Sequence, residues 1–329
     1  MIYKIVLESI GEITLLPDSQ KLFGFLMSKL NECFTEDKVS SFVNSVYEGK
    51  FKCMISNLLP KGYMPFPKAY ILDGISDNSK DIYKLIKKLE YIDKNNLVSI
   101  IRYFKTYDKI KNNRGKLKNI KDLENVIKSP ISFISTKQRY LQKFKLESQE
   151  KSIPGLSNKA YSLPVLEYYN MSGEKCCQFS FYVKVDDNTI LSSYLKQLYK
   201  NIEIEKKKSY GLGAKVSHGY NTYILKDIEK HEDTVNDKEC IYLNIGMLIP
   251  KIENINIAGS FLDIYSSNRK SYEISDSIEK VISFISPGSV IDIKNKNVSF
   301  GKCIINDYNV MYKNAVIFGN SFVKKIEVD

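Results

Sequence analysis

The chain has 329 residues, a formal net charge of +11 and 43% hydrophobic residues, which suits about two domains with packed cores. No apolar run approaches the ~18 residues of a membrane-spanning helix, and the cysteines form no C-x-x-C pair. The only histidines are His218 and His231, so the sequence carries neither a zinc signature nor a disulfide framework. We therefore expect a cytoplasmic protein without a metal or a cofactor, and with no membrane and no small-molecule substrate as partner.

The N-terminal segment predicts a strand followed by a helix. Residues 1–9 alternate apolar side chains as a strand does, and Asp18 or Ser19 can cap a helix whose apolar residues recur at helical spacing. A helix N-terminus can bind an anion, which favours Ser19, Gln20 and Lys21 as residues that face RNA. The alternative is a simple N-cap followed by core residues. Residues 51–57 predict the next strand.

Most of the net charge lies in one stretch of the chain. Residues 101–145 carry thirteen Lys and Arg against three Asp and Glu, a local excess of +10. Such a concentration is typical of proteins that bind nucleic acid or an acidic surface. A proline-rich extended segment at 59–68 and a charged helical region at 81–108 come first. Residues 109–121 then predict a basic insertion that is mobile or faces RNA.

The segment 129–166 interleaves basic and aromatic residues. Lys137 and Arg139 lie beside Tyr140 and Phe144, a pattern suited to single-stranded nucleic acid, where cations follow phosphates and rings stack on bases. An amphipathic hairpin that packs the two rings inward explains the same residues, and the sequence leaves both interpretations open.

The next segments complete an order of strands and helices. Residues 177–185 alternate as a strand, 188–202 predict a helix, and 214–225 predict a returning strand. With the N-terminal elements this gives βαββαβ, the ferredoxin-like (RRM-like) arrangement. We thus predict an α+β fold whose first domain covers 1–225 and holds a long basic insertion, with a thumb, within about 61–166.

The loop at 206–215 combines lysines, a hydroxyl, a tyrosine and glycines. Glycine permits positive φ and close approach of another chain, successive N–H groups can cradle an anion, and tyrosine can stack on a base. We interpret the loop as a clamp for the RNA backbone; a solvated turn is the alternative. The predicted contacts are Lys206, Lys207, Lys208, Ser209, Tyr210, Gly211 and Gly213.

The remainder of the chain predicts a linker and a second domain. Residues 226–238 are polar and aperiodic, which is typical of a linker. Short apolar or alternating runs separated by Pro-Gly and Gly-Asn turns then predict a β-rich domain at 239–329, or alternatively a second, degenerate ferredoxin-like unit.

Catalytic motifs are missing from the sequence. It contains no phosphate-binding loop, no dinucleotide fingerprint, no H-E-x-x-H and no G-x-S-x-G. Only His218 is placed where a general acid or base for RNA cleavage could act, and a lone histidine is more often an ordinary packing or surface residue. We expect no enzyme.

Four ordered motifs resemble the RAMP superfamily of CRISPR-associated RNA-binding proteins, and in particular subunit four of the type III-A Csm effector complex in the Cas-five-like group. Asp18–Leu26 resembles the family helix start S-x-D-x-[LI]-F-x-A-L, and Tyr63–Lys68 resembles F-L-P-K-P. Lys206–Gly213 falls where the family has G-G-K-R-x-x-G-[FY]-G, and Phe284–Val290 resembles F-x-x-G-S-V-F. Here Glu205 and Lys206 replace the first two glycines, so the loop relies more on lysine charge than on backbone N–H groups.

The resemblance implies a non-catalytic subunit. Family members hold the 5′ handle of the CRISPR RNA and bridge the large polymerase-like signature subunit to the backbone RAMP subunit. A thumb-like hairpin separates handle from guide, and 129–166 is the candidate for it. The alternatives are a RAMP endoribonuclease that processes repeat RNA with His218, and a protein-only assembly scaffold.

Overall fold

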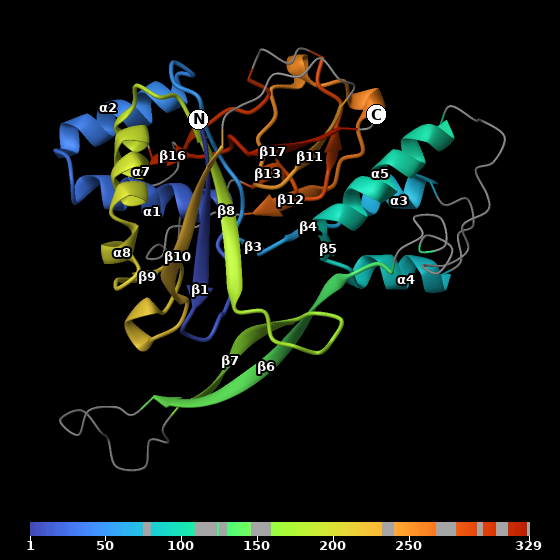
Figure 1. Ribbon diagram of the computed structural model, residues 1–329, viewed down its shortest axis with the longest axis horizontal. Coiled ribbons are helices and arrows are strands. Elements are labelled where there is room, and N and C mark those ends of the chain that lie inside the picture. Colours follow the sequence, from blue (N-terminus) through green and yellow to red (C-terminus); the bar gives the residue numbers. More distant parts are fainter. Residues whose placement is uncertain are drawn as a thin grey trace.

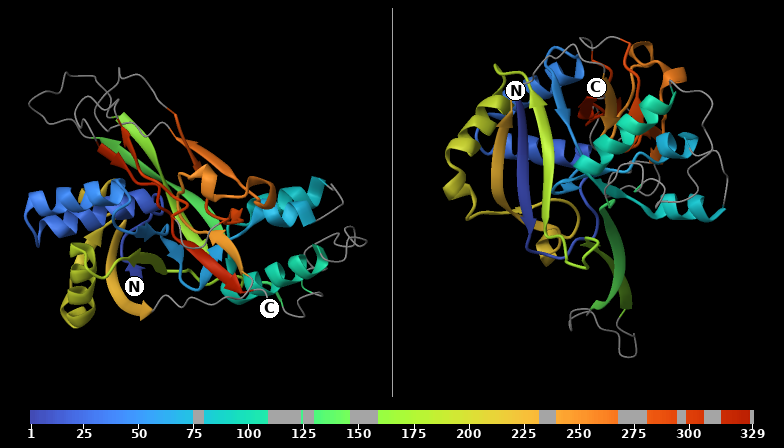
Figure 2. Two further views of the ribbon diagram at one scale, coloured as in Figure 1. Left: turned by 90° about the horizontal axis from the view of Figure 1, so that it is seen from above. Right: turned by 45° about the vertical axis from the view of Figure 1, so that its right-hand side comes forward.

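Figures 1 and 2 show a computed structural model of the chain, which describes residues 1–74, 80–108, 124, 130–145, 159–231, 240–267, 281–294, 299–306 and 315–327. Helices and strands alternate irregularly along the sequence, so the fold belongs to the α+β class, as the sequence predicted. None of the described helices is long and apolar enough to cross a bilayer. The predicted basic insertion at 109–121 lies outside the described residues.

A central antiparallel sheet organises the molecule. Its strands follow the order β2-β8-β1-β10-β9, with β3 paired to the end of β8. Every strand begins in the predicted first domain, although β2 and β8 are more than a hundred residues apart in the chain. The strands are β1 (Ile2–Ser9), β2 (Cys53–Ile55), β3 (Leu59–Pro60), β8 (Gln178–Val185), β9 (Ser209–Gly211) and β10 (Thr222–His231).

Helices cover one face of this sheet (Figure 1). Tyr3, Ile5 and Leu7 are buried on that face, as the alternation along β1 predicted, and they share a core with Leu22 and Leu26 of the first helix. Burying each such side chain contributes about 1.5–3 kcal/mol. The helices are α1 (Ser19–Asn31), α2 (Glu36–Tyr47), α7 (Ile190–Lys200) and α8 (Ile202–Glu205).

The insertion builds a second sheet in the order β4-β5-β6-β7. Its two long strands pair from Ser135↔Tyr169 to Lys145↔Lys159 and project as a hairpin from one end of the molecule (Figures 1 and 2). The charged region predicted as helical is interrupted by strand β5. The elements are β4 (Tyr63–Pro65), α3 (Lys68–Gly74), α4 (Lys80–Lys88), β5 (Tyr91–Asp93), α5 (Lys94–Asp108), β6 (Phe133–Lys145) and β7 (Lys159–Tyr169).

The C-terminal region is β-rich where it is described, with a three-stranded sheet in the order β14-β11-β17 and two hairpins. Its described residues contain only 3₁₀ turns as helical segments, at Ile252–Asn254 and Ile257–Gly259. The strands are β11 (Cys240–Asn244), β12 (Ile264–Ser267), β13 (Ile282–Ile285), β14 (Val290–Ile291), β15 (Ile304–Asn306), β16 (Ala315–Ile317) and β17 (Val323–Glu327).

The C-terminal region packs on the sheet face that the helices leave open. Tyr182 of β8 belongs to the same apolar cluster as Leu243 of β11 and Phe322. Backbone bonds join the two parts, including Asn57 N to Ile245 O at 2.8 Å. These contacts enclose the segment 244–247 between the C-terminal sheet and the start of α1.

Two predicted boundaries are wrong. Residues 226–231, which the sequence placed in the linker, continue β10 and pair with β1, where Lys226 forms an ion pair with Glu8 at 2.5 Å. The polar composition of this segment reflects its exposure, since Asp227, Lys230 and His231 are exposed and Ile228 is its one buried residue. The rest of the predicted linker, at 232–238, lies outside the described residues. The strand predicted at 214–225 begins only at Thr222, because 212–221 form a loop with a 3₁₀ turn at Val216–His218.

Candidate nucleic-acid interface

The three consecutive lysines of the glycine-rich loop differ in their surroundings. Lys206 and Lys208 form ion pairs with Glu203 at 2.7 Å and with Glu205 at 2.6 Å, both within one turn of α8. Lys207 is exposed, and no carboxylate of the described chain lies within ion-pair distance of its ammonium group. Lys207 therefore supplies the least compensated positive charge of the three to a phosphate.

Tyr210 anchors the loop to the protein. Its ring is only 7% exposed, packs edge-to-face on Phe25 with 5.8 Å between ring centroids, and has the Lys29 ammonium 5.6 Å from its centroid. Its hydroxyl donates a hydrogen bond to Glu205. Burial alone would raise the pKa of Glu205, but hydrogen bonds from Lys208 and Tyr210 outweigh it and lower that pKa. The prediction that Tyr210 stacks on a base is wrong, because its ring is enclosed.

The structure explains why glycine occupies two positions of the loop. A Cβ at Gly211 would lie 2.2 Å from Cγ1 of Val216, and Gly213 adopts φ 128°, a region open mainly to glycine. Ser209 and Gly211 are exposed on the edge strand β9. The loop thus folds tightly on itself and presents Ser209 and Gly211 at the surface.

Residues at the start of α1 differ in their burial and hydrogen bonds. The Asp18 carboxylate caps the helix by accepting a hydrogen bond from Lys21 N at 2.9 Å, one of the two caps that the sequence predicted. Ser19 is fully buried, and its hydroxyl accepts a hydrogen bond from Met247 N at 3.0 Å, so its predicted contact with RNA is wrong. Gln20 is half-buried and Lys21 is exposed.

Lys21, at the start of α1, lies apart from the point where the helix contacts Tyr210 of the glycine-rich loop. Lys29, near the end of α1, contacts Tyr210 of the loop. Lys21 lies eight residues earlier on the same helix, roughly 12 Å away at the rise of an α-helix. Lys21 can therefore contact a chain that extends past the loop.

The hairpin β6–β7 carries its predicted basic residues near its base. Arg139 bonds Glu12 at 2.6 Å and lies 3.8 Å from Glu167, whose pKa is lowered by hydrogen bonds from Lys175 and Tyr169. The ammonium of Lys137 lies 4.7 Å from the centroid of the Tyr169 ring. Tyr140 is 62% exposed, so the inward-packed alternative is wrong for this ring. The side chain of Phe144 lies outside the described part.

Asn221 joins the hairpin base to the glycine-rich loop. Its Nδ2 donates to Ala214 O and Thr14 Oγ1 at 2.7 Å each, and its backbone N–H donates to Glu12 O at 2.9 Å. Tyr220 beside it is buried against Leu163 and Val165 of β7. The loop and the hairpin base therefore meet at the same end of the central sheet (Figure 1). Our sequence reasoning missed Asn221, although an asparagine after Gly219-Tyr220 is a typical residue for the left-handed backbone it adopts.

Comparisons of the whole structure find known folds that match it. A chain of the "Csm1-Csm4 cassette in complex with cA4" is 12% identical with a TM-score of 0.51, and the match covers 100% of this chain and 99% of that one. A chain of the "Csm3-Csm4 subcomplex in the type III-A CRISPR-Cas interference complex" is 15% identical with a TM-score of 0.52, over 98% of both chains. Csm4 is the subunit common to both complexes.

The chain has the Csm4 fold. No family model and no curated protein sequence matches the chain, so the likeness rests on structure and on the ordered motifs. Both matches cover nearly the full length of the two chains. The fold is the one that the motifs indicated.

In the part of the chain that the structure describes, no three His, Cys, Asp or Glu side chains gather as metal ligands would. His218 is exposed in the 3₁₀ turn, with its Nδ1 3.2 Å from Ser217 Oγ.

Proposed function

We propose that the chain is a non-catalytic RNA-binding subunit of a type III-A CRISPR effector complex and holds the 5′ handle of the CRISPR RNA. One observation carries the proposal. The glycine-rich loop and the base of the β6–β7 hairpin meet at the same end of the sheet, in a chain with the Csm4 fold.

The surface at this end suits a single-stranded backbone. Lys207, Ser209 and Gly211 are exposed on the loop and offer one uncompensated charge, a hydroxyl and a small residue. Tyr140 projects from the hairpin with a ring on which a base can stack. Contacts of this kind hold phosphate and bases without reading a long sequence, which fits a subunit that carries one constant segment of RNA.

We propose that the first domain is ferredoxin-like. Its elements include β1, α1, β2, β8, α7 and β10, which is βαββαβ once the insertion and the additional elements α2, β3, α8 and β9 are set aside. In that numbering, the strand order β2-β8-β1-β10 is 2-3-1-4, the order that a ferredoxin-like sheet has.

The proposed partners are the large signature subunit and the backbone RAMP subunit of the complex. The matched structures pair Csm4 with Csm1 in one case and with Csm3 in the other, and this chain shares their fold along its whole length. A bridge between these two subunits is therefore the arrangement that we propose for it. Co-expression with each candidate partner, followed by affinity purification, tests the two contacts separately.

A binding experiment tests the function. The purified chain, alone and with the large subunit, is titrated with labelled RNA that carries the repeat-derived handle and with RNA of equal length that lacks it. We expect tighter binding of the handle-bearing RNA and no cleavage. Metal-independent cleavage that disappears in His218→Ala would instead establish the endoribonuclease. Equal or absent binding of both RNAs with the large subunit present would establish a protein-only scaffold.

A further inference from the structure

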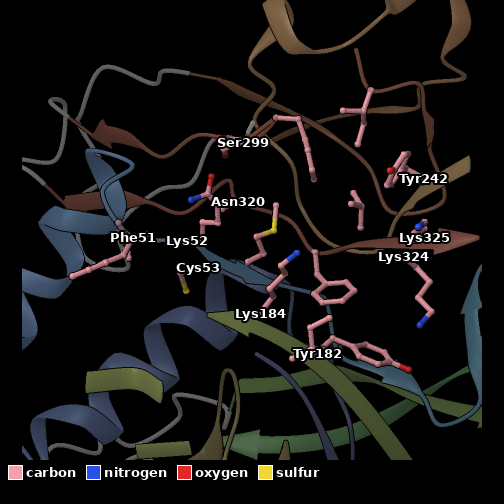
Figure 3. Close-up of a pocket in the computed structure, with 18 of the residues that line it drawn as sticks. Phe51, Lys52, Cys53, Tyr182, Lys184, Tyr242, Ser299, Asn320, Lys324 and Lys325 are labelled. Carbon is pink, nitrogen blue, oxygen red and sulfur yellow. Dashed lines mark hydrogen bonds between the residues drawn. The ribbon is translucent and has the colours of Figure 1, made fainter. Parts of the chain in front are cut away.

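A second basic site lies on the other side of the molecule. A pocket of about 580 Å³ opens between the helix-free face of the central sheet and the C-terminal region (Figure 3). Tyr182 and Lys184 of β8 line one wall, and Lys324 of β17 and Asn320 line the wall opposite. The pocket reaches the Ile2 end of β1, whereas the glycine-rich loop adjoins the Ser9 end, about 23 Å away along the strand.

The pocket is strongly positive. Eight lysines line it against two glutamates, Glu229 and Glu327. One of the glutamates is already engaged, because Glu229 forms an ion pair with Lys4 at 2.6 Å. An enclosure of this charge, between walls of low dielectric constant, concentrates anions.

Lys324 is a poorly compensated lysine of this pocket. Burial lowers the pKa of its half-buried ammonium group, and the charges of Lys94 and Lys4 lower it further. Its contact with the Tyr182 ring, 5.7 Å to the centroid, is weak, and among the described residues no carboxylate lies within ion-pair distance. A buried cation surrounded by like charges is costly, so a bound anion would stabilise it.

Asn320 adds an unmet hydrogen bond. Its side chain is 8% exposed and lines the pocket, and its Oδ1 is buried with no hydrogen-bond donor among the described residues (Figure 3). Buried acceptors are almost always satisfied, so a turn of the amide that presents Oδ1 to the pocket, where a ligand N–H or O–H group can bond it, is favoured. The anion that fits therefore carries a donor as well as negative charge.

We propose that this pocket binds a nucleotide, either free or as one unit of an RNA chain, with its phosphate on Lys324 and an amino or hydroxyl group on Asn320. The volume falls in the range of sites for small ligands and is far larger than one phosphate ion needs. The rings of Tyr182 and Phe322, with centroids 5.4 Å apart, supply an apolar wall beside the charges. This site is separate from the proposed handle interface and does not depend on it.

Thermal shift and equilibrium binding on the full-length chain test the proposal with three probes: AMP, a short single-stranded oligoribonucleotide and inorganic tripolyphosphate. We expect AMP, the oligonucleotide or both to bind and to raise Tm. In Lys324→Met the affinity should fall at least about tenfold, the loss of one charge-assisted hydrogen bond. The ligand-free variant should be as stable as the wild type or more stable, since it removes a poorly compensated buried charge.

Matched variants separate the site from general charge. Lys38→Gln, at an exposed lysine of α2 outside the pocket, should leave binding of all probes unchanged. Asn320→Ala should weaken the binding of the nucleotides but not that of tripolyphosphate. Binding of AMP by itself identifies a free nucleotide. Binding of the oligonucleotide alone identifies an RNA segment when it weakens in Lys324→Met and Asn320→Ala, since RNA held at the loop and hairpin would not respond to these variants.

Four results would overturn the proposal. Three are binding of no probe, binding of tripolyphosphate as tightly as the nucleotides, and unchanged affinity in Lys324→Met. A fourth is binding of a polyglutamate peptide in place of the nucleotides, which would identify an acidic protein as the partner. Handle-RNA binding measured in the same variants reports separately on the proposed function, because Lys324→Met leaves the loop and the hairpin intact.

Discussion

The hydroxyl of Tyr210 donates a hydrogen bond to the carboxylate of Glu205, which also accepts one from Lys208 at 2.6 Å. This junction fixes the glycine-rich loop to the end of α8 and removes the tyrosine ring from the surface. A ligand can therefore contact the exposed residues Lys207, Ser209 and Gly211 of the loop, but not the ring of Tyr210. Its shape is set before any RNA arrives.

Tyr210→Phe tests this anchoring role. The substitution keeps the buried ring and removes the bond to Glu205, so we expect the free energy of unfolding to fall by about 1–3 kcal/mol, the range for bonds to charged groups. Urea unfolding measures it. A change within 0.5 kcal/mol would show that the bond contributes nothing to the loop. Tyr199→Phe, at an exposed tyrosine of α7, is the control and should be neutral.

Lysine variants of the loop should differ in the salt dependence of RNA binding. Lys207→Ala removes an uncompensated cation, so the slope of log K against log salt should flatten by about 0.7, the value for one phosphate contact on a single strand. Lys206→Ala and Lys208→Ala should change it less, because their charges are shared with Glu203 and Glu205. The triple variant should flatten it most. Equal slopes in the wild type and the triple variant would contradict the clamp.

The sequence predicted the parts of the fold that rest on local pattern. Apolar alternation placed β1 and β8 correctly, and the Asp18 cap placed the start of α1, because these signals depend on residues within one turn or strand. It could not predict the burial of Ser19. That burial depends on Met247, a residue 228 positions away whose N–H bonds the Ser19 hydroxyl.

The misplaced linker has a similar cause. Residues 226–231 resemble a linker because all of them except Ile228 are charged or polar. Their strand structure comes from pairing with β1, including the ion pair of Lys4 with Glu229, and tertiary pairing of this kind overrides local propensity. The basic pocket also depends on tertiary structure and could not be predicted, because its lysines come from segments spread over the whole chain.

Acid should destabilise the protein through three paired glutamates. Glu167, Glu205 and Glu229 have pKa values below the ordinary 4.5 because lysines or tyrosines donate hydrogen bonds to them. A carboxyl with a depressed folded-state pKa contributes stability above its unfolded pKa and loses it as pH falls through the folded value. Stability should thus be constant above about pH 5 and decline below pH 4.5.

Glu167→Gln isolates one of these contributions. It removes the carboxylate that Lys175 and Arg139 share, so urea unfolding from pH 6 down to pH 3 should show lower stability at pH 6 and a shallower acid decline. Glu253→Gln, at an exposed glutamate with no ion pair in the described chain, is the control and should reproduce the wild-type profile. An unchanged acid decline in Glu167→Gln would refute the assignment.

The exposed ring of the hairpin should contribute to RNA affinity. Tyr140→Ala removes a stacking surface worth about 1–3 kcal/mol per base, so binding of handle RNA should weaken by about fivefold or more. Stability should change by less than about 0.5 kcal/mol, since the ring is exposed. Fluorescence polarisation measures the affinity, with Tyr199→Ala as the exposed aromatic control on α7. An equal loss of RNA affinity in both variants would show that the hairpin ring has no specific role in binding.

Gly211 should be intolerant of any side chain while Val216 is present. In Gly211→Ala the new Cβ would lie 2.2 Å from Val216 Cγ1, so we expect a loss of about 1–3 kcal/mol in stability and weaker RNA binding as the loop shifts. Val216→Ala removes the clashing methyl groups, and in the double variant it should restore part of both properties. The coupling in this double-mutant cycle should exceed 0.5 kcal/mol. Gly24→Ala, where a Cβ meets nothing within 4 Å, should instead be neutral or stabilising in helix α1. Additive effects at Gly211 and Val216 would show that the loop is not held by this contact.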